Sequence, residues 1–148
     1  MIPKQRKLFL KIIILLALIF PAFAQGSSSV NSIFIPTWQG FDFAKAKIVD
    51  REEGDIVILP GGIETSSLQV EIAALEKGFI EDIKNLPEEE VINWTNFEEY
   101  VIDMLYAVRT GNKKYALFEL IDVKVSDDEI IGIEIEYKYQ PNGSKEFD

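Results

Sequence analysis

The sequence predicts an α+β fold, built mostly from antiparallel β-sheet with one main helix at about residues 96–105. Three β-rich runs near the C-terminus are separated by short polar turns, which is typical of an antiparallel meander. A helix-capping pattern precedes the first of these runs. With 148 residues, no internal repeat and one Gly/Ser-rich segment near its start, the chain is expected to form a single domain over residues 33–148.

The first 24 residues have the pattern of a secretory signal peptide. Basic residues precede a dense apolar run, Ile12 to Phe20, and Pro21 is followed by the small-residue pattern Ala22-Phe23-Ala24. Cleavage is expected between Ala24 and Gln25. An uncleaved anchor is the alternative, but Lys11 interrupts the run and Pro21 ends it short of the roughly 20 apolar residues that a membrane span needs. Residues 25–32 are rich in Gly, Ser and Asn and are predicted to be a flexible lead-in.

Three upstream runs are predicted to be strands. They are centred on Phe41 and Phe43, on residues 55–59, and on the alternating Leu68, Val70 and Ile72. Pro60-Gly61-Gly62 predicts a turn after the second run. Residues 68–76 are ambiguous, because Ala73 to Glu76 are good helix formers and the segment could instead be a short helix that ends at Gly78.

The predicted helix at about residues 96–105 starts from a capping box. Thr95 and Glu98 have the S/T-x-x-E spacing, in which each side chain bonds to the other's backbone N–H. Phe97, Val101, Met104 and Leu105 then fall on one stripe of a helical surface. We expect this stripe to cover the sheet, with Met104 in the helix core and Trp94 packed against the start of the helix.

The C-terminal meander is predicted from runs at residues 106–110, 114–125 and 130–140. In the last run Ile133, Ile135, Tyr137 and Tyr139 alternate with polar residues, so one face is expected to be buried and the other wet. The middle run is apolar on both faces. Leu117, Ile121 and Val123 are assigned to one face, and Ala116, Phe118 and Leu120 are assigned to the other, which predicts a central strand covered on both sides.

Composition excludes several kinds of chemistry. The chain has no Cys and no His, which excludes disulfides, thiolate zinc sites, Cys or His nucleophiles and a Ser-His-Asp relay. After cleavage, 11 Lys and Arg would face 25 Asp and Glu, a net charge of −14. Such a charge repels phosphate backbones and anionic headgroups, so neither nucleic acid nor a membrane surface is an expected partner of the mature chain, and no cofactor is expected.

Two C-terminal segments carry a family resemblance. They are Val108 to Ala116 and Ile135 to Gly143, and Phe147 follows them. About the last 45 residues resemble uncharacterised exported bacterial and archaeal proteins with a T-x-x-G-K-Y-A hairpin and a terminal Y-x-Y-Q-P-x-G strand. More distantly, the hairpin is similar to the HmuY-like haem-binding exported proteins, which implies a β-rich fold and export. The haem function is not carried over, because that family's iron ligands are histidines and this chain has none.

Two features are candidates for ligand binding. Asp127, Asp128 and Glu129 lie in a predicted hairpin turn and could hold calcium, although the spacing differs from an EF-hand and Asp is common in tight turns for its own backbone hydrogen bonds. Trp38, which lies between Pro36 and Gly40, is the aromatic residue with the best prospect of exposure and could form a carbohydrate platform. Trp94, Tyr137 and Tyr139 are also aromatic but are expected to pack in the core.

The predicted function is that of a small acidic exported domain which binds a ligand or a protein partner of the cell envelope or exterior without catalysis. A small hydrolase with paired carboxylates is the alternative, and a strongly raised carboxyl pKa in a cleft would favour it. A subunit of a larger envelope assembly, docked through the acidic last strand, is a third possibility. Asn93 and Asn142 match the N-glycosylation acceptor pattern.

Overall fold

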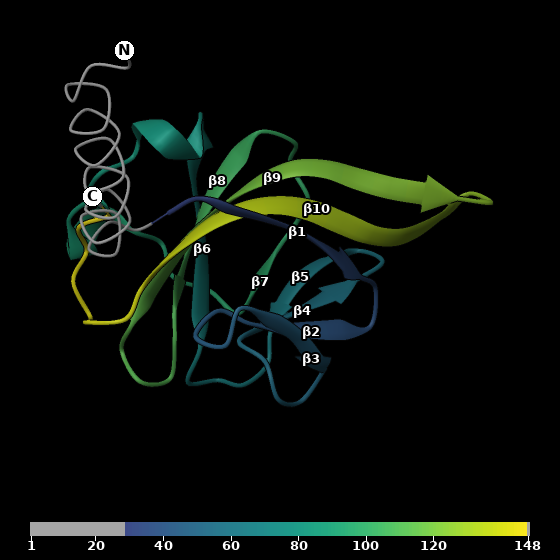
Figure 1. Ribbon diagram of the computed structural model, residues 1–148, viewed down its shortest axis with the longest axis horizontal. Helices are drawn as coiled ribbons and strands as arrows, with labels where there is room; N and C mark the ends of the chain where they lie inside the picture. Colours follow the sequence, from purple (N-terminus) through teal and green to yellow (C-terminus); the bar gives the residue numbers. More distant parts are fainter. Residues whose placement is uncertain (1–28, 148) are drawn as a thin grey trace, which may run out of the picture.

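Ten antiparallel β-strands form two five-stranded sheets in the computed structural model, which describes residues 29–147 (Figure 1). Sheet A has the strand order β1-β10-β9-β8-β6, and sheet B has the order β3-β2-β4-β5-β7. The strands are β1 (Asn31–Pro36), β2 (Gln39–Asp42), β3 (Lys47–Asp50), β4 (Ile56–Leu59), β5 (Gly62–Thr65), β6 (Glu71–Lys77), β7 (Phe97–Glu98), β8 (Met104–Arg109), β9 (Tyr115–Ser126) and β10 (Glu129–Gln140).

The main core lies between the two sheets. Aliphatic side chains of β4 and β5 in sheet B meet those of β1, β8, β9 and β10 in sheet A there, and nearly all of them are inaccessible to solvent. The aromatic side chains form a connected group: the ring of Phe41 lies 5.1 Å from the rings of both Phe43 and Tyr137, and Phe118 stacks on Tyr106 at 5.0 Å. Edge-to-face and stacked pairs of this kind add to the free energy of apolar burial.

Strand β9 is central in sheet A and buried on both faces, as its sequence predicts. Ala116, Phe118 and Leu120 point into the core between the sheets. Tyr115 and Leu117 point the other way, into a second apolar cluster on the outer face of sheet A. This second cluster is closed by residues 80–94 and by the C-terminal Phe147.

Two β-bulges change the facing of side chains in the β9–β10 hairpin. Ile121 has no partner between the pairs Leu120–Ile135 and Asp122–Glu134, so the alternation shifts by one residue there. Val123 consequently packs against the same core as Phe118, and its predicted assignment to the face of Leu117 is wrong. A second irregularity leaves Ile131 as an extra residue between Ile130 and Gly132.

Residues 80–94 and Phe147 form an outer cover on sheet A, and buried polar side chains attach this cover to the sheet. The Glu119 carboxylate accepts a hydrogen bond of 2.9 Å from the backbone N–H of Ile80, and Lys138 Nζ donates to the carbonyl of Ile83 at 3.3 Å. The cover contains two short 3₁₀ helices, η1 (Ile80–Asp82) and η2 (Glu89–Val91). The C-terminal segment bonds to the chain between them, because Leu86 N–H donates to Lys145 and Phe147 N–H donates to Lys84.

The predicted α+β class is wrong: residues 29–147 form a nearly all-β fold without an α-helix, so the main helix expected at residues 96–105 is absent. Thr95 N–H donates to Ile72 across a bridge to β6, and the Glu98 carboxylate accepts the N–H of Ala74 and not that of Thr95. The expected capping box is therefore replaced by contacts with the neighbouring strand, and Met104 belongs to β8. The segment before β8 is extended because pairing with β5 and β6 satisfies more backbone groups than a short isolated helix could.

The observed bounds and order of the strands decide several other predictions. Residues 71–77 form a strand, so the alternative short helix ending at Gly78 is wrong. Strand β10 lies between β1 and β9, which excludes the acidic last strand as a docking edge. Strand β1 begins at Asn31, within the predicted lead-in, whereas residues 1–28, with the predicted cleavage site between Ala24 and Gln25, lie outside the described residues.

The turn between β8 and β9 places a lysine in a conformation suited to glycine. Lys113 has φ 57°, in the left-handed region, and its N–H donates to Thr110 at 2.9 Å. In the T-x-x-G-K-Y-A pattern this position is the glycine. A side chain with a Cβ atom is disfavoured at such a φ.

We expect Lys113→Gly to raise the free energy of unfolding by about 0.5–1 kcal/mol, because glycine adopts this φ without strain. Urea denaturation measures the change. The matched control is Asn112→Gly, since Asn112 is not among the residues with positive φ and the added glycine should only destabilise. Stabilisation by Asn112→Gly, or destabilisation by Lys113→Gly, would contradict the assignment of strain to Lys113.

Candidate binding site

A cleft at one end of the sandwich brings together residues from three turns. Thr37 and Trp38 come from the β1–β2 turn, Pro60 from the β4–β5 turn, and residues 128–131 from the end of the β9–β10 hairpin. These residues line a cavity of about 590 Å³. Trp38 and the pair Asp128 and Glu129, which the sequence analysis proposes for separate reasons, are therefore neighbours in one cleft.

Trp38 is held in an exposed position by the backbone. Its φ of 67° lies in the left-handed region, which is rare for a bulky residue. Hydrogen bonds fix the turn on both sides: Trp38 N–H donates to Ile58 at 2.6 Å, and Thr37 N–H donates to the bulged Ile131 at 3.0 Å. The Trp38 side chain is 54% exposed, and the Arg51 guanidinium lies 5.7 Å from its ring centre.

The acidic residues beside Trp38 are explained first by the geometry of their turn. Asp127 and Asp128 have φ values of 52° and 64°, as the two central residues of a tight hairpin turn require, and Asp tolerates this conformation. Among residues 29–147, no group of three or more acidic side chains is arranged to hold a metal ion. The geometry therefore gives the calcium hypothesis for Asp127, Asp128 and Glu129 no support. Asp128 and Glu129 are left as hydrogen-bond acceptors at the wall of the cleft.

Among residues 29–147, two carboxyl groups have raised pKa values, and each has a structural role. Burial raises the pKa of Asp55, although its carboxylate accepts the N–H of Phe43 at 2.9 Å. Burial also raises the pKa of Glu119, the residue that anchors Ile80. Neither residue lines the Trp38 cleft or another cavity in the described part of the chain, so the raised pKa values do not mark a paired-carboxylate active site.

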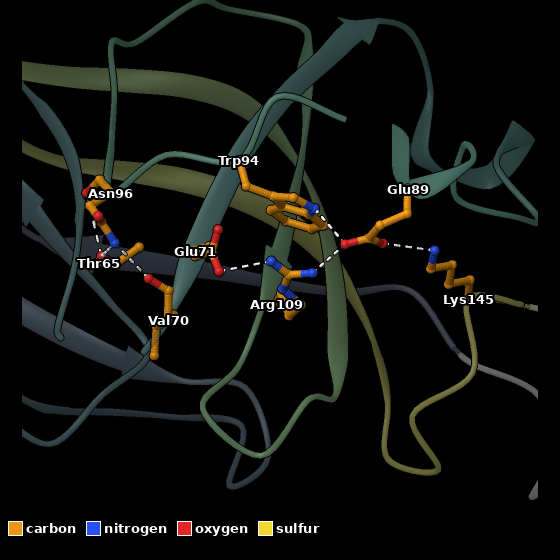
Figure 2. Close-up of polar contacts among 8 residues, drawn as sticks. All are labelled: Thr65, Val70, Glu71, Glu89, Trp94, Asn96, Arg109 and Lys145. Atoms are coloured by element: carbon orange, nitrogen blue, oxygen red, sulfur yellow. Dashed lines mark hydrogen bonds and ion pairs between the residues drawn. The ribbon is translucent and has the colours of Figure 1, made fainter. Parts of the chain in front are cut away.

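A charged network joins the outer cover to the edge of sheet A (Figure 2). The Arg109 guanidinium on β8 pairs with Glu71 on β6 at 2.7 Å and with Glu89 on η2. Glu89 also accepts Trp94 Nε1–H at 2.9 Å and pairs with Lys145 at 2.8 Å. The hydrogen bond from Lys145, followed by that from Trp94, lowers the pKa of Glu89.

Trp94 belongs to this network and not to a helix start. Arg109 lies 4.7 Å from the ring centre of Trp94, and the ring of Tyr115 lies 6.4 Å from that of Trp94. A cavity of about 590 Å³ lies beside the network. Because both carboxylates of the network already pair with Arg109, we interpret it as a device that fixes the cover to the sheet. No local sequence motif indicates this network, since its members are spread from Glu71 to Lys145.

The remaining sequence candidates lie elsewhere. Tyr137 is buried in the core between the sheets, and Tyr139 packs against that core. Asn93 and Asn142, the possible glycosylation acceptors, are both exposed, and the Asn142 side chain accepts the N–H of Ser144. No helix in residues 29–147 has the length and apolar character of a membrane span.

Comparison with known proteins gives a fold relationship only. No protein-family model and no curated protein sequence matches the chain. Among solved structures, the chain is similar to the crystal structure of an apo HmuY analog from Tannerella forsythia, with a TM-score of 0.54 and 10% sequence identity. The alignment covers 77% of this chain and 96% of that chain. This likeness supports the HmuY-like fold that the sequence resemblance implies.

The raised pKa of Asp55 predicts a pH dependence of the free energy of unfolding that a variant with a neutral residue at this position lacks. In the folded protein Asp55 takes up its proton at a higher pH than in the unfolded chain, where the value is near 3.8. Between these two values the native state binds more protons, so the free energy of unfolding rises as the pH falls. We therefore expect the stability of the wild type relative to Asp55→Asn to increase from pH 7 to pH 4.

Urea denaturation of both proteins at each pH measures this difference. The asparagine oxygen can still accept the N–H of Phe43, so the comparison isolates the charge. A wild-type advantage that shrinks towards pH 4 would contradict the assignment.

Proposed function

We propose that the chain is an exported, non-catalytic binding module whose ligand site is the Trp38 cleft and whose ligand is a glycan. The observation that supports this most directly is the exposed ring of Trp38. The backbone of Trp38 has a left-handed φ, and two hydrogen bonds hold the turn in this conformation. Strained conformations persist only where the surrounding structure enforces them, and they concentrate at functional sites.

The other walls of the cleft suit the same chemistry. A sugar ring presents a C–H face that can stack on an indole, while its hydroxyl groups need acceptors at the edge. Asp128 and Glu129 supply carboxylate acceptors, and the Thr37 hydroxyl can both donate and accept. An open cleft of about 590 Å³ with mixed polar and apolar walls falls within the size range of ligand sites in proteins.

Export is proposed from the signal-peptide pattern of residues 1–24, and the HmuY-like fold agrees with a binding role. A paired-carboxylate hydrolase is less well supported, because the buried Asp55 and Glu119 each accept a backbone N–H away from the cleft. An envelope or extracellular protein partner stays compatible with the fold. It would dock at the outer strands β1, β6, β3 or β7, since β10 is internal.

The test uses a panel of immobilised glycans and the purified protein, followed by titration calorimetry of any glycan that binds. We expect Trp38→Gly to weaken binding at least tenfold, because it removes the stacking surface while glycine accepts the left-handed φ. Asp128→Asn, which keeps a residue that tolerates the turn, should weaken binding several-fold by removing a charged acceptor.

Phe79→Ala is the matched control, because Phe79 is an aromatic residue of similar exposure that does not line the cleft. Its binding should equal that of the wild type. Glycan binding that survives Trp38→Gly unchanged would contradict the site, and a panel with no binder would contradict the ligand class.

A further inference from the structure

A third cavity lies between β6 and the outer cover, on the opposite side of sheet A from the main core. It has a volume of about 240 Å³, and its apolar lining residues include Leu75 from β6, Leu105 from β8, and Ile83, Val91 and Ile92 from the cover. Its polar lining groups are Glu76, Asn85 and Asn93, all of which are exposed or partly exposed. Polar and apolar groups therefore contribute about equally to the lining, and solvent reaches the polar ones.

The cavity forms where β6 departs from regular pairing. Ala74 pairs with Tyr106 and Lys77 pairs with Met104, so Leu75 and Glu76 together lie opposite the single residue Leu105. An irregularity of this kind bends an edge strand and redirects its side chains. Leu75 packs against the second apolar cluster, and Glu76 lies beside it at the cavity wall.

The volume limits the size of the ligand. An apolar cavity of about 150 Å³ can hold benzene, whereas sites for drug-sized molecules start near 300 Å³. At about 240 Å³ this cavity suits one ring or a short alkyl chain.

The charge of the lining determines the head group. Glu76 is the only charged residue in the lining. Among the exposed residues next to the lining in sequence, Glu88 and Glu90 are acidic, and Lys77 and Lys84 are basic. The mature chain would carry a net charge of −14, so a carboxylate ligand is repelled and an ammonium group is attracted. Asn85 and Asn93 add amide oxygens that accept hydrogen bonds from such a group.

We propose that this cavity binds a small primary amine with an apolar body, with the body among Leu75, Ile92 and Leu105 and the ammonium group beside Glu76. The site is separate from the Trp38 cleft, because the two cavities share no residue. The proposal thus does not depend on the glycan-binding function.

The first experiment is a titration of the isotope-labelled protein with linear alkylamines from butylamine to octylamine, followed by amide shifts in NMR spectra. We expect saturable shifts at Leu75, Ile92 and Asn93, with no matching change at Trp38. The affinity should rise about fourfold for each added methylene group and then level off when the cavity is full. The absence of saturable shifts at the lining residues would overturn the proposal.

The second experiment compares hexylamine, hexanol and hexanoate, and tests the head group separately. Hexylamine should bind most tightly and hexanoate most weakly. Glu76→Gln should weaken hexylamine binding about two- to fivefold, as expected for an exposed ion pair, and leave hexanol unaffected. Glu90→Gln, which removes the same charge from an exposed residue outside the lining, should have a smaller effect. Equal affinities for all three compounds, unchanged by Glu76→Gln, would overturn the assignment of an amine.

Discussion

The burial of β9 on both faces is the constraint on which the rest of the structure depends. A strand with apolar side chains on both sides is stable only where each side has its own cover. Sheet B covers one face of β9, and residues 80–94 with Phe147 cover the other. The outer cover has little regular structure, so polar contacts attach it: Glu119 and Lys138 bond to its backbone, and Arg109 pairs with Glu89.

The same hairpin also forms the candidate binding site. The first half of β9 is buried, whereas its last residues are exposed, so the β9–β10 hairpin extends past the other strands of sheet A (Figure 1). Its far end meets the β1–β2 and β4–β5 turns, and the bulged Ile131 bonds to the first of them. The Trp38 cleft is therefore a consequence of how far the central hairpin reaches beyond the core.

The sequence predicts the parts of the fold whose cause is local. Strict alternation in residues 133–139 and the double-faced pattern of residues 115–120 place β10 and β9 correctly, and Asp127-Asp128 marks the turn between them. The helix at residues 96–105 fails because the same Thr95 and Glu98 that match a capping box are used by β6. A local pattern cannot reveal that a neighbouring strand offers better partners for those groups. The predicted sheet face of Val123 is wrong for a similar reason, because a single bulge at Ile121 reverses the alternation of side chains.

The candidate site is predictable only in part. Trp38 and the Asp128-Glu129 pair are recognisable as unusual residues in turns, but their meeting depends on the lengths of three hairpins. The Arg109 network and the cavity between β6 and the outer cover both depend on residues 83–94 folding back over sheet A. No spacing rule indicates that arrangement, because the segment is neither helical nor a strand for most of its length.

Native-state hydrogen exchange tests the central claim most directly. If the outer cover is required for the burial of β9, its backbone should open only when the whole domain unfolds. The amides of Leu86 and Phe147, which bond the C-terminal segment to the cover, should then exchange with the same free energy as the amides of Leu117 and Phe118 in β9. Exchange of Leu86 and Phe147 at a free energy several kcal/mol lower, with β9 still protected, would contradict the account.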